Sequence, residues 1–80
     1  MYERIKKYIE ISEVPNYAHK TKKWRIRNKD TGEILGRIEW YGGWRKYVYY
    51  NHISEAYCDW DFLRMVADFC EQETKNHYAL

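Results

Sequence analysis

The chain has 80 residues, of which 19% are Phe, Trp or Tyr and 32% are charged, and its formal net charge is +2. This length suits one domain with a single core and leaves no room for a second core. No run of even ten apolar residues occurs, which argues against a signal peptide, a transmembrane helix or a membrane partner, so we expect a cytoplasmic protein.

Residues 6–14 alternate imperfectly between apolar and polar side chains, which favours a β-strand, although the segment from Met1 to Ile9 could also begin a helix. In the strand interpretation, one side carries Ile9 and Ile11, and the other carries Tyr8, Glu10 and Ser12. The only proline, Pro15, then falls in a loop that leads to the sheet.

Residues 22–50 predict two successive β-hairpins. The segment KDTGE fits a three-residue loop of Asp30, Thr31 and Gly32, in which Gly32 takes a positive φ. This loop pairs Lys29 with Glu33, Asn28 with Ile34, Ile26 with Gly36, and Trp24 with Ile38.

The segment YGGW fits a two-residue loop, because a Gly-Gly pair accepts the left-handed dihedral angles of the primed turns. This second loop pairs Tyr41 with Trp44, Trp40 with Arg45, Glu39 with Lys46, Ile38 with Tyr47, and Gly36 with Tyr49.

The two hairpin registers place the side chains on the same two faces, as a real sheet requires. The predicted core face carries Trp24, Ile26, Ile34, Gly36, Ile38, Trp40, Tyr47 and Tyr49. The predicted opposite face carries Arg25, Arg27, Leu35, Arg37, Glu39, Tyr41, Trp44, Lys46, Val48 and Tyr50.

Residues 59–74 predict an amphipathic helix, since apolar side chains recur there every three or four positions. We expect Asp59 to cap its N-terminus and residues 75–80 to form a fraying tail. The predicted core stripe consists of Phe62, Leu63, Met65, Val66, Ala67, Phe69 and Cys70.

These elements predict one α+β domain over residues 1–80, in which a C-terminal helix packs on one face of an antiparallel sheet of three or four strands. The helix should cover Trp24, Ile38 and Trp40, and Gly36 should allow it to approach closely.

The pattern G-x-I-x-W-Y-G-x-W-R-x-Y, residues 36–47, is followed by L-R-x-V-A-D-F, residues 63–69. Together these motifs resemble a group of small uncharacterised proteins of bacteriophages and prophages. The resemblance implies a small sheet with one helix, a phage setting and the host cytoplasm. The group has no assigned catalytic residues that could be transferred to this chain.

We predict no enzymatic activity, no metal and no cofactor. His19, His52 and His77 stand far apart in predicted loops or in the tail, without the partners that a catalytic base needs. Cys58 and Cys70 lack the spacing of a zinc site, and two reduced thiols are the simplest interpretation.

The basic and aromatic sheet face predicts binding of a nucleotide-like anion, because Tyr and Trp stack on bases while Arg and Lys contact phosphates. The predicted ligand-binding residues are Arg25, Arg27, Arg37, Tyr41, Trp44, Lys46 and Tyr50. In a phage setting this function would suit a host-defence antagonist, with the ligand held on the sheet face or at the interface of a homo-oligomer.

Three other interpretations use the same side chains. The protein could inhibit a host protein through this face, since Tyr, Trp and Arg dominate interface hot spots. It could bind single-stranded nucleic acid. Alternatively, Tyr41 and Trp44 only pair across the hairpin, Glu39 and Lys46 form a cross-strand pair, and the arginines keep the sheet soluble.

Overall fold

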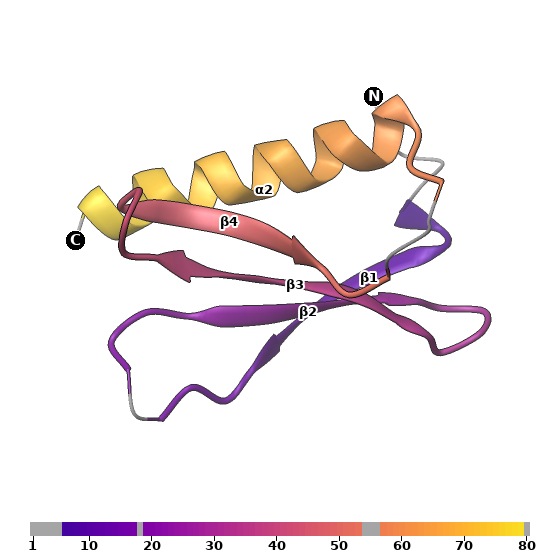
Figure 1. Ribbon diagram of the computed structural model, residues 1–80, viewed down its shortest axis with the longest axis horizontal. Coiled ribbons are helices and arrows are strands. Elements are labelled where there is room, and N and C mark those ends of the chain that lie inside the picture. The colour runs from indigo at the N-terminus through magenta and orange to yellow at the C-terminus, as the bar shows by residue number, and fades with distance from the viewer. Residues whose placement is uncertain (1–5, 18, 54–56, 80) are drawn as a thin grey trace.

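Four antiparallel strands lie side by side in sequence order, and one long helix covers one face of the sheet (Figure 1). The computed structural model describes residues 6–17, 19–53 and 57–79. The elements are β1 (Ile9–Val14), β2 (Lys23–Asn28), β3 (Ile34–Tyr41), β4 (Lys46–Asn51) and α2 (Trp60–Ala79). This architecture confirms the predicted α+β fold, with four strands.

The core between the sheet and α2 is built largely from aromatic rings. Ile26 and Ile38 are fully buried at its centre. The Trp24 ring meets the Tyr47 ring edge-on at a centroid distance of 5.2 Å and the Phe69 ring at 5.0 Å. Trp24 and Trp40 therefore lie on the same, helix-covered face, as the alternation predicted.

Gly36 allows close approach of a neighbouring strand rather than of the helix. A Cβ atom at this position would lie 2.4 Å from the backbone oxygen of Tyr50 and 2.6 Å from the Tyr49 ring. The Tyr49 hydroxyl donates a hydrogen bond to the carbonyl of Leu35 at 3.2 Å. The expected contact between Gly36 and the helix is therefore wrong, because the Tyr49 ring fills that space.

The first hairpin has a four-residue loop, Lys29 to Gly32, instead of the predicted three-residue loop. The Gly32 amide donates to the Asn28 carbonyl, while the Asn28 side chain accepts from the amides of Asp30 and Thr31. Gly32 has the predicted positive φ, 76°.

A bulge in β3 compensates for the longer first loop. Ile26 pairs with Gly36 as predicted, but Arg27 pairs with Ile34, which leaves Leu35 as an extra residue. Leu35 consequently packs against the core, whereas Ile34 is absent from the core cluster among the described residues. The predicted placement of these two side chains is therefore wrong.

The second hairpin also has a four-residue loop, Gly42 to Arg45, so the predicted Gly-Gly turn is wrong. The carbonyl of Tyr41 accepts hydrogen bonds from the amides of Trp44 and Arg45, and Arg45 takes the left-handed conformation with φ 55°. Tyr41 now pairs with Lys46, Trp40 with Tyr47, Glu39 with Val48 and Ile38 with Tyr49. This register differs from the predicted one by two residues, which preserves the face of every strand residue.

Strand β1 begins at Ile9, later than predicted, because Lys7 and Tyr8 form a turn. Ile9 is buried, and Ile11 packs against the core cluster.

The helix is capped as predicted but is longer at its C-terminus. The Asp59 carboxylate accepts a hydrogen bond from the Phe62 amide at 2.9 Å. Residues 75–79 continue the helix instead of fraying, because the His77 ring packs 4.3 Å from the Trp40 ring and the Tyr78 hydroxyl donates to the Arg45 carbonyl.

Two residues of the predicted core stripe face solvent. Leu63 is 56% exposed and Ala67 is also exposed, while Phe62, Met65 and Val66 are buried. The helix therefore buries a narrower stripe of side chains than predicted.

We expect Met65→Ala to lower the free energy of unfolding by ~2–5 kcal/mol, because it leaves a cavity in the core. Leu63→Ala is the matched control on the same helix and should change it by no more than ~0.5 kcal/mol. Denaturant unfolding of both variants measures the difference. An equal loss in both variants would contradict the assigned helix orientation.

Candidate anion-binding face of the sheet

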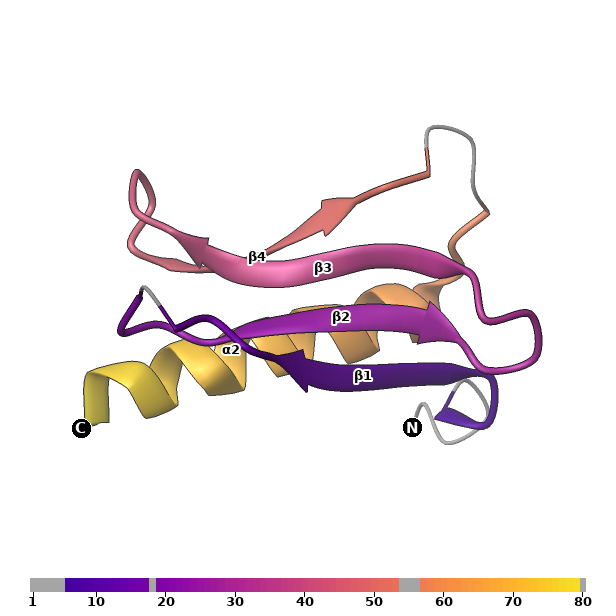
Figure 2. The same cartoon turned by 90° about the horizontal axis from the view of Figure 1, so that it is seen from below.

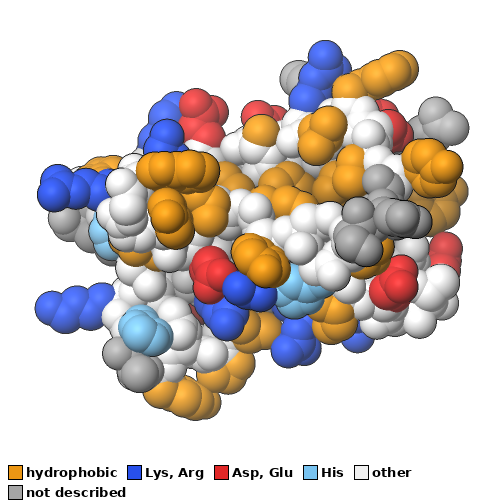
Figure 3. All heavy atoms as spheres, in the orientation of Figure 1, with side chains coloured by type: hydrophobic (Ala, Val, Ile, Leu, Met, Phe, Trp, Pro, Cys, Tyr) orange, Lys and Arg blue, Asp and Glu red, His pale blue; other side chains and the backbone are white. Residues whose placement is uncertain are grey.

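The face of the sheet that α2 leaves open, here called the outer face, carries most of the residues predicted to bind a ligand. Figure 2 shows β2 and β3 in front of α2, with the outer face toward the viewer. In the space-filling view, several Lys and Arg side chains project on the side away from the helix (Figure 3). The strand residues of the outer face are Glu10, Ser12, Val14, Lys23, Arg25, Arg27, Ile34, Arg37, Glu39, Tyr41, Lys46, Val48 and Tyr50.

Two arginines lie directly opposite each other in the middle of this face. Arg25 on β2 pairs with Arg37 on β3. Like charges in such a cross-strand pair destabilise a sheet. A negative charge next to the two guanidinium groups would offset this repulsion.

Arg37 is held in place by three neighbours. Its Nε donates to the Glu39 carboxylate at 2.6 Å, and one terminal nitrogen lies 2.8 Å from Nε2 of His52. Its Cζ atom lies 4.0 Å from the centroid of the Tyr50 ring, a cation–π arrangement. Arg37 is therefore oriented before any ligand arrives.

The Arg25 side chain is exposed and has no ion pair or hydrogen bond within the described part of the chain. It borders a shallow depression of about 380 Å³. The depression is lined by Val14, Pro15, Lys23, Trp24, Arg25, Gly36, Arg37 and His52. Three cationic side chains thus converge on one hollow, and we call Lys23, Arg25, Arg37, Tyr50 and His52 the basic row.

Arg27 lies on the same face but already has an anionic partner. Its guanidinium forms an ion pair with the carboxylate of Glu10 on β1. The hydrogen bond from Arg27 is the largest cause of the lowered pKa of Glu10, followed by the hydrogen bond from Ser12. Arg27 is therefore less available to a ligand than Arg25.

The predicted stacking residues Tyr41 and Trp44 lie apart from the basic row. Trp44 belongs to the loop after β3 and is 66% exposed, and its ring meets the Tyr41 ring at a centroid distance of 5.0 Å. Tyr41 is four residues beyond Arg37 on β3, which corresponds to roughly 13 Å at ~3.3 Å per strand residue. We call Tyr41, Trp44 and the opposing Lys46 the aromatic tip.

Six of the seven predicted residues therefore fall into two groups, and the seventh belongs to neither. Arg25, Arg37 and Tyr50 belong to the basic row; Tyr41, Trp44 and Lys46 form the aromatic tip; and Arg27 is engaged by Glu10. Lys23 and His52 also belong to the basic row, although neither was predicted as a site residue. Lys23 lies two residues before Arg25, and His52 lies two residues after Tyr50. This spacing could have predicted them, because alternate residues of an extended chain share a face.

In residues 6–17, 19–53 and 57–79, no group of three His, Cys, Asp or Glu side chains could hold a metal ion. Cys58 and Cys70 are both free thiols, and burial raises the pKa of Cys70 to about 11. In the same residues, no helix combines the length and the apolar character needed to cross a membrane.

Comparison with known proteins gives no relative for this chain: no family model matches it, and no curated protein or solved structure matches it either.

The ion pair between Glu10 on β1 and Arg27 on β2 predicts how the pKa of Glu10 responds to mutation. Arg27→Ala should raise the pKa of Glu10 toward its ordinary value, because the mutation removes the largest cause of the lowered pKa. Since this pKa is lowered on folding, the stabilisation by the pair is present above the unfolded-state pKa and is lost as the pH falls through the folded-state pKa.

A carboxyl-detected NMR titration measures the Glu10 pKa directly. Arg25→Ala is the control and should leave this pKa unchanged. Identical Glu10 titration curves in the wild type and the Arg27 variant would show that the ion pair does not form in solution.

Proposed function

We propose that the protein is a non-enzymatic binding protein that takes up a nucleotide-like, phosphate-bearing ligand on its outer face. The observation that carries the proposal is the opposed pair Arg25 and Arg37 at the edge of a depression that Lys23 and His52 also line. The phosphate would bind in this hollow.

The chemistry of the basic row suits a phosphate group. Guanidinium groups bind phosphate oxygens through paired, charge-assisted hydrogen bonds, and two facing arginines offer several donors from opposite sides. Glu39 is the acidic neighbour of this row, and it contacts Arg37 rather than Arg25. The Arg25 side therefore remains the attractive one for an anion.

The aromatic side chains suit the base of such a ligand. Tyr50, at the basic row, is 54% exposed although Arg37 lies over its ring, while Trp44 and Tyr41 expose further ring surface at the aromatic tip. Stacking of a base on an aromatic side chain contributes ~1–3 kcal/mol. A ligand with both a phosphate and a base would gain from both kinds of contact.

Single-stranded nucleic acid is the second candidate, and the separation of the two groups favours it. The backbone positions of Arg37 and Tyr41 lie roughly 13 Å apart along β3, and a short oligonucleotide would contact both groups at once. The open outer face would admit a chain that continues past either end.

The phage setting, the role against host defence and the inhibition of a host protein stay predictions. The identity of the ligand would test the phage setting and the role against host defence. If no nucleotide binds, inhibition of a host protein becomes the first candidate function.

Arg25→Ala should weaken binding of the phosphate-bearing ligand by at least tenfold while leaving the fold intact, because the mutation removes an exposed cation that has no side-chain partner among residues 6–17, 19–53 and 57–79. Calorimetry against mononucleotides, cyclic dinucleotides, nicotinamide-derived nucleotides and short oligonucleotides would measure the effect. Arg27→Ala is the matched control, since it removes the same charge from the same strand but from a side chain already bound to Glu10.

The salt dependence separates the two candidates. An oligonucleotide should show a steep loss of affinity with salt, because several counterions are released, and a mononucleotide a shallower one. No binding of any of these compounds, or equal losses in the Arg25 and Arg27 variants, would overturn the proposal.

A further inference from the structure

The two edges of the sheet are protected to different degrees. At the β4 edge, the Tyr47 amide donates a hydrogen bond to the Thr74 hydroxyl of α2 at 3.0 Å. Strand β1 forms the other edge and pairs only with β2. An edge strand with unpaired backbone groups is a template for another strand.

The hydrogen bonds between β1 and β2 show which backbone N–H and C=O groups of β1 point away from the sheet. The Lys29 amide donates to the Tyr8 carbonyl at 2.8 Å, so the backbone groups of Tyr8 point toward β2. Backbone orientation alternates along a strand, so those of Glu10, Ser12 and Val14 also point toward β2. The backbone groups of Ile9, Ile11 and Glu13 therefore point to the free edge. For Ile11 and Glu13, no other described residue supplies a hydrogen bond to these groups.

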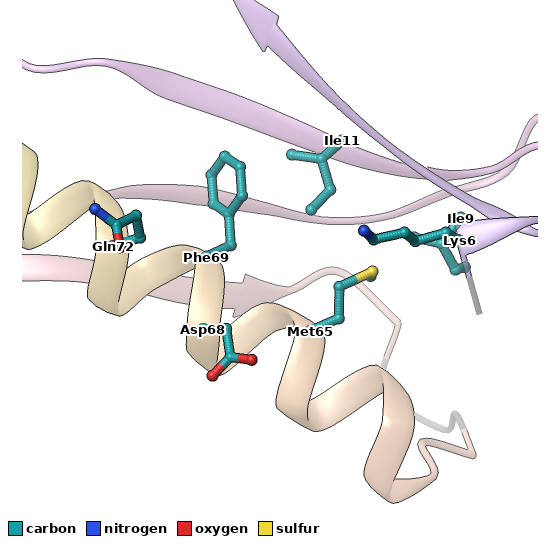
Figure 4. Close-up of a pocket in the computed structure, with 7 residues that line it drawn as sticks. All are labelled: Lys6, Ile9, Ile11, Met65, Asp68, Phe69 and Gln72. Carbon is teal, nitrogen blue, oxygen red and sulfur yellow. The ribbon is translucent and has the colours of Figure 1, made fainter. Parts of the chain in front are cut away.

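An apolar groove of about 480 Å³ runs beside this edge, between β1 and α2 (Figure 4). The side chains of Ile11, Phe69 and Met65 extend into the space between the strand and the helix. Ile11 and Phe69 are only half-buried. A strand added to β1 would place every second side chain next to this groove, which is the arrangement used in β-strand addition.

We propose that β1 of a second copy of this chain adds to the free edge in antiparallel orientation, around a two-fold axis at Ile11. The resulting dimer has one continuous eight-stranded sheet. The axis is perpendicular to the sheet, so both copies of α2 lie on one face and both basic rows stay open on the other. The dimer therefore does not depend on the proposed ligand.

The sequence of β1 is compatible with itself in this register. Ile11 lies opposite Ile11 of the second copy, beside both grooves, and Glu10 lies opposite Ser12 in both directions. Glu13 lies opposite Ile9, at the end of the groove that Lys6 lines, so an acidic side chain approaches a basic one.

Two neighbouring registers would also join the outward backbone groups of the two β1 strands, but they are less favourable. An axis at Glu10 would place two carboxylates directly opposite each other, which destabilises a strand pair. An axis at Ser12 would place each Ile11 opposite Glu13 and lose the contact between the two isoleucines. The register at Ile11 is the one without either conflict.

Light scattering coupled to size exclusion should give a mass of twice 10.0 kDa at high protein concentration. Amide hydrogen exchange identifies the interface: the Ile11 and Glu13 amides should become protected as the protein concentration rises, whereas the Ser12 and Val14 amides should be protected at every concentration. A monomer at all concentrations, or a dimer whose Ile11 and Glu13 amides exchange freely, would overturn the proposal.

Glu13→Pro tests the edge by mutation, because it removes an outward N–H without touching the pairing with β2. We expect this variant to be monomeric with an unchanged circular dichroism spectrum, and Glu13→Ala, which keeps the N–H, to remain a dimer. A folded Glu13→Pro variant that still dimerises would show that another surface is used. Protection that depends on binding to a different protein, without self-association, would likewise contradict a second copy as the occupant.

Discussion

The edge-on packing of Trp24 between Tyr47 and Phe69 is the contact on which the rest of the structure depends. It joins strands β2 and β4 to helix α2 through one side chain, in a core with few aliphatic residues. Aromatic pairs in this geometry contribute ~0.5–1.5 kcal/mol beyond the area they bury. Because these rings commit α2 to one face, the opposite face is left to charged and aromatic side chains.

The alternation of side chains predicted the two faces even where the predicted pairing was wrong. The second hairpin slips by two residues relative to the prediction, yet Trp40, Tyr47 and Tyr49 stay on the core face, because a slip of two conserves the face. The bulge at Leu35 is an insertion of one residue, and there the prediction failed. The sequence thus predicts reliably which face a strand residue occupies, while loop length depends on local backbone hydrogen bonds.

The loop lengths depend on interactions that the turn motifs do not reveal. The Asn28 side chain organises the first loop by accepting two backbone hydrogen bonds, and Arg45, not a glycine, takes the left-handed conformation in the second loop. The Tyr78 hydroxyl bonds to the Arg45 carbonyl from the far end of the helix. This long-range contact also explains why the helix continues where the sequence suggested a tail.

The candidate site shows the same limit, since a shared face does not imply a shared site. Strand alternation placed Arg25, Arg37 and Tyr41 on one face, but it carries no information on which acid neutralises which arginine. The structure pairs Glu10 with Arg27 and Glu39 with Arg37, and leaves Arg25 without an ion pair in the described residues.

The positions of Arg25 and Arg37 help to decide whether the arginines of the outer face only keep the sheet soluble. Charges that protect a sheet from aggregation are expected on its edge strands. Arg25 and Arg37 lie on the two central strands, β2 and β3, and they face each other. Dispersed charges would keep the sheet soluble without the repulsion between opposed guanidinium groups. Glu39 offsets the charge of Arg37 but does not contact Arg25. Under the proposed function, a bound anion would offset the charge of Arg25.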